Sequence, residues 1–98
     1  MKKDIHSETV EKLFNAVMSL KNMEECYLFF EDICTVNELL SLSQRLQVAK
    51  MLSEGKTYMD ISGNTGASTA TISRVNRSLI YGNDGYKIVL DRLAKPEE

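Results

Sequence analysis

Apolar residues recur along this chain at intervals of three and four, which is the spacing of one face of an α-helix. The first stripe of this kind is formed by Val10, Leu13, Phe14, Val17 and Leu20. It predicts a helix over about residues 8–20, with Ser7 as its N-cap. The apolar–polar alternation of half-buried strands is nearly absent from the chain, so we expect an all-α protein.

Two further helices are predicted, each opened by a polar residue that can cap it. The second covers about residues 23–34, follows Asn22, and is apolar over much of its circumference. The third covers about residues 36–53, because Thr35 and Glu38 form a capping box and Gly55 suits the left-handed residue after a helix. Its core stripe is expected at Leu39, Leu42, Leu46, Ala49 and Leu52.

The segment over residues 57–79 has the layout of a helix-turn-helix. Thr57 opens a short helix that ends near Thr65, and Ser68 caps a second helix over about residues 69–80. Gly66 lies between them and can adopt the positive φ that a tight turn requires. The residues expected to join the two helices to each other and to the preceding helix are Ile61, Ser62, Ile72 and Val75.

The loop Gly82-Asn83-Asp84-Gly85 separates this motif from a last helix, so six helices are expected in all. We expect one domain over residues 1–98, with dimerisation helices over 1–34, a central core helix over 35–55, the helix-turn-helix over 57–80 and a C-terminal helix over 86–95. The first two helices carry more apolar surface than a chain of 98 residues easily hides, which favours a homodimer.

Composition excludes several classes of function. The chain is 43% hydrophobic and 27% charged, which is ordinary for a globular protein. It has one histidine, His6, and no metal-ligand cluster or nucleophile motif, so we expect no metal, no catalytic residue and no enzyme. No membrane span or export signal is recognisable, and we expect a cytoplasmic protein. Cys26 and Cys34 are too far apart on the predicted helix to form a disulfide with each other.

The charges are unevenly distributed along the chain. Residues 45–77 include five basic and two acidic side chains, a net charge of +3, although the whole chain carries −2. A mildly basic centre between acidic ends is compatible with a local DNA-binding face. The sequence pI of about 5.4 argues against strong non-specific binding, which depends on many phosphate contacts.

The second helix of the motif contains no acidic residue, and most of its polar side chains can contact bases or phosphates. Without its apolar positions, the polar residues that remain are Thr69, Thr71, Ser73, Arg74, Asn76, Arg77 and Ser78. A serine- and threonine-rich helix after a glycine is also often only a solvated surface helix. Gly63 and Asn64 weaken the first helix of the motif, which would leave the hairpin mobile until it meets DNA.

From about Cys34 to Leu93 the chain resembles the Trp repressor superfamily, and more closely its YerC/YecD group. The resemblance is carried by Thr35-Val36-Asn37-Glu38-Leu39, Ser43-Gln44-Arg45, Leu52-Ser53-Glu54-Gly55 and Gly66-Ala67-Ser68-Thr69-Ala70-Thr71-Ile72-Ser73-Arg74. It implies an all-helical, intertwined homodimer that inserts two recognition helices into successive major grooves of double-stranded DNA.

The resemblance also implies which residues contact DNA. The base-reading positions are Thr69, Ala70 and Ser73, and Arg74 is a candidate contact to the phosphate backbone. The flanking positions are Tyr58, Met59, Ser62, Asn76 and Arg77. Three of these, Tyr58, Met59 and Ser62, replace long polar or basic side chains of the family, which implies a different operator and weaker electrostatic binding.

In the repressor a tryptophan corepressor binds between the third helix and the recognition helix. The resemblance places Arg45 and Arg74 on either side of such an effector, with Thr35, Thr71 and Ser78 around it. The family's glycine beside the indole is Val75 here, and an isopropyl group opposes ring binding in a packed pocket. We therefore expect no tryptophan and no cofactor, although another small-molecule effector remains open.

The leading hypothesis is a sequence-specific DNA-binding transcriptional regulator, a repressor by resemblance. Two alternatives stay open on the same fold. One is a protein-interaction module, which the acidic ends and low basicity would suit. The other is a sensor of a small molecule other than tryptophan.

Overall fold

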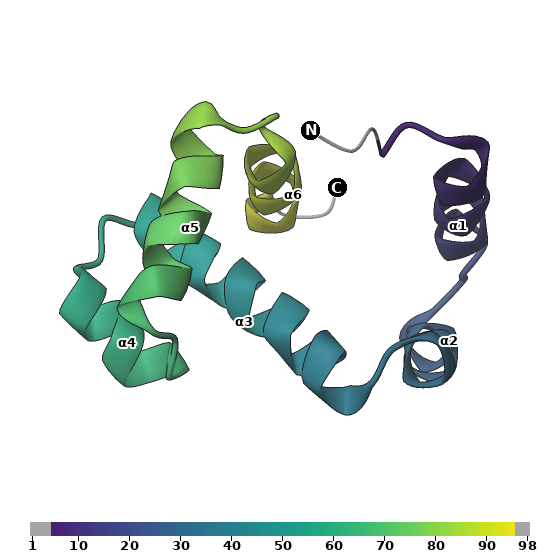
Figure 1. Ribbon diagram of the computed structural model, residues 1–98, viewed down its shortest axis with the longest axis horizontal. Helices are drawn as coiled ribbons and strands as arrows, with labels where there is room; N and C mark the ends of the chain where they lie inside the picture. The colour runs from purple at the N-terminus through teal and green to yellow at the C-terminus, as the bar shows by residue number, and fades with distance from the viewer. Residues whose placement is uncertain (1–4, 96–98) are drawn as a thin grey trace. The chain divides into compact units, whose positions relative to one another are not determined.

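The computed structural model describes residues 5–95 of the chain, and these residues form helices and no strands. The elements are α1 (Glu8–Met18), α2 (Met23–Ile33), α3 (Val36–Ser53), α4 (Tyr58–Thr65), α5 (Thr69–Tyr81) and α6 (Gly85–Ala94), shown in Figure 1. The predicted all-α class and the order of the helices are confirmed. The chain divides within α3 into two compact units, residues up to Leu39 and residues from Leu40 onward.

Polar side chains open four of the helices where the sequence predicts N-caps. In each case the cap oxygen accepts a hydrogen bond from the amide three residues later, and the four caps are Ser7, Asn22, Thr57 and Ser68. The helix boundaries lie within about two residues of the prediction. The largest difference is in α1, which ends at Met18 rather than near Leu20.

Helix α3 opens with the predicted capping box. The Thr35 amide donates to Glu38 Oε1 at 2.8 Å, and the Glu38 amide donates to Thr35 Oγ1 at 3.1 Å. The backbone amide of Thr35, and then its hydroxyl, stabilise the carboxylate and lower the pKa of Glu38 below its ordinary value of 4.5. Because this folded-state pKa is depressed, the contribution of Glu38 to stability is present above the ordinary pKa and is lost as the pH falls through the folded one.

The first unit contains α1 and α2 and leaves many of its large apolar side chains open to solvent. None of the residues of either helix is buried. Phe14 is 54% exposed and Leu28 is 61% exposed. Cys26 and Cys34 are free thiols and are half-buried, as expected for two cysteines that cannot pair along one helix. The apolar faces of these two helices therefore find little cover within the unit.

The second unit has a compact apolar core where α3, α4 and α5 meet. The buried side chains are Val48, Ala49, Ile61, Ala67, Ile72 and Val75, and they are flanked by Met51, Leu52, Leu79, Tyr86 and Leu90. In Figure 1 α4 and α5 lie side by side, joined by a short turn. The prediction that Ile61, Ile72 and Val75 join the helices of the motif is confirmed.

Two expectations about this packing were wrong. Ser62, expected at a close helix contact, is exposed on α4. On α3 two members of the predicted core stripe, Leu42 and Leu46, are also exposed. Two other members, Ala49 and Leu52, are buried or packed against the core as predicted, and Val48, which was not in the stripe, is buried as well. Helix α3 carries apolar residues on several sides, so helical spacing alone identified only part of the side that packs in the core.

The turn between α4 and α5 is built as the sequence predicts. Gly66 has φ of +72°, and its amide donates to the carbonyl oxygen of Ser62 at 2.9 Å. Gly63, by contrast, lies inside α4 without a positive φ. Asn64 partly compensates for the weakness of this helix, because its Nδ2 donates to the carbonyl oxygen of Asp60 at 2.8 Å.

These two glycines give a matched pair of substitutions with opposite expected signs. An added methyl at either position meets nothing within 4 Å, so packing does not decide the outcome. Gly66→Ala should lower the free energy of unfolding by about 1–2 kcal/mol, because a Cβ disfavours the left-handed region. Gly63→Ala should raise it by about 0.5–1 kcal/mol, because alanine is the better helix former. Urea unfolding at one protein concentration measures both changes in the free energy of unfolding. Changes of the same sign would contradict the left-handed role of Gly66 and the helical role of Gly63.

Candidate nucleic-acid interface

The outward side of α5 presents most of the residues that the sequence predicts to contact DNA. Thr69, Ala70, Ser73, Arg74 and Arg77 are all exposed. Thr69, Ser73 and Arg77 follow one another at intervals of four, so their side chains share a face of the helix. This face combines hydroxyls and a guanidinium, which bond to base edges and phosphates.

The inward side of the same helix is fixed to the core. Ile72 and Val75 are buried, and Leu79 packs against them. Asn76 lies at the border and is half-buried, so it is the least available of the predicted contacts on α5. The helix is therefore held by its apolar side while its polar side stays open, which is the arrangement that a recognition helix needs.

Helix α4 supplies the predicted flanking positions. Tyr58 is 38% exposed and Met59 is 85% exposed, and Ser62 is also open to solvent. No acidic residue occurs in α5, and α4 contains one, Asp60. The hairpin surface is thus nearly free of the negative charge that would repel phosphate.

The residues predicted around an effector differ in their exposure and in the hydrogen bonds that they make. Arg45 is half-buried on α3, whereas Arg74 is exposed on α5. Thr35 belongs to the first unit, where its hydroxyl caps α3. The Thr71 hydroxyl accepts a hydrogen bond from Ser68 Oγ at 3.1 Å, within the N-cap of α5. Two of the five predicted effector side chains therefore have a structural role in helix capping.

Val75 takes part in the core rather than facing an open slot. It is 2% exposed and belongs to the same cluster as Val48, Ile61 and Ile72. Because close-packed interiors leave little room beside such a side chain, a planar ring would have to displace core atoms here.

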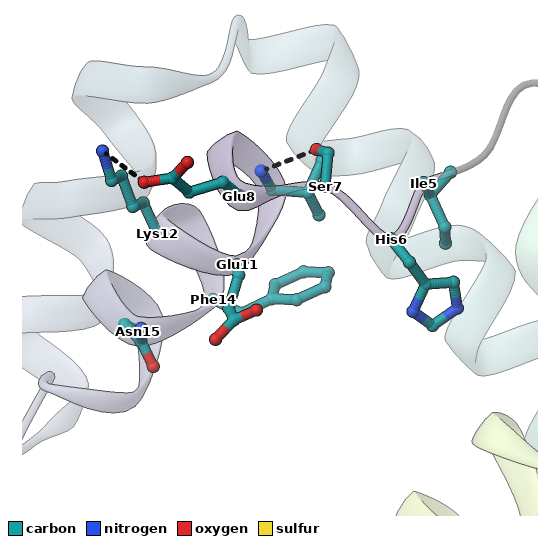
Figure 2. A pocket seen from close by; sticks show the side chains of 9 residues that line it. Ile5, His6, Ser7, Glu8, Glu11, Lys12, Phe14 and Asn15 are labelled. Carbon is teal, nitrogen blue, oxygen red and sulfur yellow. Dashed lines mark hydrogen bonds and ion pairs between the residues drawn. The ribbon is translucent and has the colours of Figure 1, made fainter.

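Surface hollows of the described residues include two whose linings contain none of the predicted DNA-contacting residues. One, of about 590 Å³, surrounds the start of α1 and is lined by Ile5, His6, Glu11 and Phe14 among others (Figure 2). Figure 2 also shows the ion pair between Lys12 Nζ and Glu8 Oε1, at 3.5 Å. The other hollow, also about 590 Å³, includes Leu46, Tyr86 and Val89, and of the predicted effector residues it contains Ser78.

Residues 5–95 contain no cluster of His, Cys, Asp and Glu that could hold a metal ion. The same range has no helix with the length and apolar composition needed to cross a membrane.

Gln44 makes a contact with Thr65 that helical spacing could not predict. Its Nε2 donates to the carbonyl oxygen of Thr65 at 3.1 Å and so links α3 to the end of α4. The sequence places Gln44 beside Arg45 in a motif of the resemblance, but a hydrogen bond between residues 21 positions apart has no local signal.

Comparisons with known proteins agree with this geometry. The family model for the Trp repressor protein matches residues 8–94. The uncharacterized protein YerC of Bacillus subtilis is 57% identical over 93 residues, which cover 95% of this chain and 89% of YerC. The crystal structure of a TrpR-like protein from Eubacterium eligens is 63% identical, with a TM-score of 0.90 over 96% of this chain and 97% of that one. A candidate Trp repressor from Staphylococcus aureus is 53% identical, with a TM-score of 0.90 over 99% of this chain and 100% of that one.

The role of Val75 in the core can be tested by its removal. Val75→Gly should lower the free energy of unfolding by about 3 kcal/mol, from the cavity together with the poor helix propensity of glycine. Ala70→Gly in the same helix is the control and should cost only about 1 kcal/mol, because Ala70 is exposed. Denaturant unfolding at fixed protein concentration compares the two variants. Equal losses would show that Val75 contributes little to the core.

Proposed function

Since the chain belongs to the Trp repressor family, we propose that it is a sequence-specific DNA-binding transcriptional regulator, a repressor by kinship. It acts as a homodimer in the bacterial cytoplasm, and each copy inserts α5 into the major groove of double-stranded DNA. Thr69, Ala70 and Ser73 read base edges, and Arg74 and Arg77 contact phosphates.

The observation that carries this proposal is the division of α5 into two sides. Its apolar side is anchored in the core by Ile72 and Val75, and its outer side is polar, exposed and free of acid. Two exposed arginines stand beside a row of hydroxyls on this side, and both kinds of side chain can bond to phosphates and base edges. The adjoining exposed residues of α4, Tyr58 and Ser62, lie where flanking contacts are expected.

The charge on this surface supports modest electrostatic binding. The region over residues 45–77 has a net charge of +3, and Met59 and Tyr58 stand where the family has long polar or basic side chains. Few phosphate contacts mean a shallow dependence of affinity on salt. Specific recognition then relies on base contacts and on the symmetric arrangement of two half-sites.

The homodimer is supported by the exposed apolar surface of the first unit. Phe14, Leu28 and other large side chains of α1 and α2 remain open to water, and the residues of these helices include none that is buried. Exposed surface of this kind marks an interaction site. A second copy of the chain presents the same surface, and a twofold dimer would cover both at once.

We propose further that tryptophan is not the effector. Val75 is packed in the core beside Ile72, and the hydroxyls of Thr35 and Thr71 are engaged in helix caps. The hairpin is held by its core contacts with α3, so binding to DNA does not require a corepressor. An anion recognised by Arg45 and Arg74 is the alternative, and a rise in melting temperature on addition of amino acids would favour it.

DNA binding is tested by selection from random double-stranded fragments at about physiological salt. The retained fragments should share a near-palindrome with half-sites about one helical turn apart, without added tryptophan. Ser73→Ala should then lower the affinity for the selected site about 5- to 100-fold, because a base contact is lost. Ser43→Ala, an exposed serine on α3, is the matched control and should change little. An absence of enrichment would favour the protein-interaction module instead.

The homodimer is tested by placing a charge on the first unit. Leu28→Glu should shift the protein from dimer toward monomer in sedimentation analysis, because an unpaired carboxylate is costly in an apolar interface. Met59→Glu introduces the same change at a more exposed residue of the second unit and should leave the dimer intact. A monomeric parent protein, or a Leu28→Glu variant as dimeric as the parent, would overturn this arrangement.

A further inference from the structure

Gln44 makes a hydrogen bond of unusual reach in this chain. Its Nε2 donates to the carbonyl oxygen of Thr65 at 3.1 Å, and both residues are half-buried. Other side-chain hydrogen bonds of the described residues, such as those of Asn64 and Ser68, join residues only a few positions apart. The bond of Gln44 instead joins α3 to the end of α4.

The carbonyl that receives this bond needs a partner. Thr65 is the last residue of α4, and the final carbonyls of a helix have no amide ahead of them to accept from. A carbonyl that is withdrawn from water without a donor costs free energy. The side chain of Gln44 supplies the donor from outside the hairpin.

Thr65 in turn fixes the segment that leads into α5. Its Oγ1 donates to the carbonyl oxygen of Ile61 at 2.7 Å and accepts from the Ala67 amide at 3.1 Å. Ala67 is buried in the core, and the next residue, Ser68, caps α5. A short series of hydrogen bonds therefore runs from Gln44 through Thr65 to Ala67, which directly precedes the N-cap of α5.

We infer that Gln44 is a positioning residue, which holds the turn on α3 and so sets the orientation of α5 for DNA without a ligand. This inference rests on the proposed function for its consequence at DNA, while the hold on the turn can be measured without DNA. The core residues fix the position of α5. Gln44 fixes the turn between α4 and α5, which leads directly into the base-reading residues at the start of α5.

The experiment compares variants of the full-length protein. Gln44→Met keeps the length of the side chain and removes the donor, and Gln44→Glu places a carboxylate against the carbonyl oxygen of Thr65. Gln47→Met is the matched control, because Gln47 is an exposed glutamine on the same helix. The readouts are amide hydrogen exchange by NMR and affinity for the DNA retained in the selection above.

Both Gln44 variants should speed the exchange of the Gly66 and Ala67 amides by about 3- to 10-fold, with Gln44→Glu the larger effect. The amides of Val48 and Ala49, in the middle of α3, should exchange at the parent rate. DNA affinity should fall by about 3- to 10-fold, as expected for one lost hydrogen bond, and Gln47→Met should match the parent in both readouts.

Each other outcome has a definite meaning. Unchanged exchange at Gly66 and Ala67 would overturn the hold on the turn, whatever happens to DNA binding. Faster exchange with parent affinity for DNA would overturn the positioning role. A parent protein that binds no DNA would overturn the proposed function. The amide exchange rates would still show whether Gln44 holds the turn on α3. If the variants do not fold, the side-chain amide of Gln44 in the parent protein must exchange more slowly than that of Gln47, or the inference fails.

Discussion

The structure of the second unit depends on the burial of six side chains where α3, α4 and α5 meet. Val48 and Ala49 come from α3, Ile61 from α4, and Ile72 with Val75 from α5, with Ala67 in the turn between the last two. A close-packed cluster of this kind permits few alternative arrangements of the helices that carry it. The short, glycine-containing α4 is weak as an isolated helix, so it keeps its place because Ile61 is part of this cluster.

The polar surface of α5 follows from the same packing. Once Ile72 and Val75 face inward, helical geometry turns Thr69, Ser73 and Arg77 outward on one face. Helix packing alone thus exposes the hydroxyls and the guanidinium of this face. Val75 is one of the side chains that complete this packing, and its burial supports our proposal that tryptophan is not the effector.

The first unit differs from the second because its described residues form no buried core of their own. Its helices have sound caps at Ser7 and Asn22 and regular apolar stripes, yet they bury none of their own residues. Helices of eleven residues are marginal in water without tertiary contacts. The stability of these helices therefore depends on contacts that cover their apolar faces. In the proposed homodimer a second copy of the chain would provide these contacts, so this unit would fold as the dimer forms.

The sequence by itself determined the features that depend on neighbouring residues. The N-caps, the Thr35–Glu38 capping box and the left-handed turn at Gly66 all involve contacts within a few positions, so residue type and spacing predict them. The buried partners Ile61, Ile72 and Val75 were also predictable, since the helix-turn-helix fixes their offsets from the turn. The exposed face of α5 followed from those offsets by elimination.

Only the tertiary structure decided features that join distant parts of the chain. It added Val48 to the core side of α3 and left Leu42 and Leu46 exposed, because several sides of this helix are apolar and packing chooses among them. It left Ser62 exposed, and it brought Gln44 within hydrogen-bond distance of Thr65. Such pairings depend on how helices lie against one another, which the local pattern of residues does not specify.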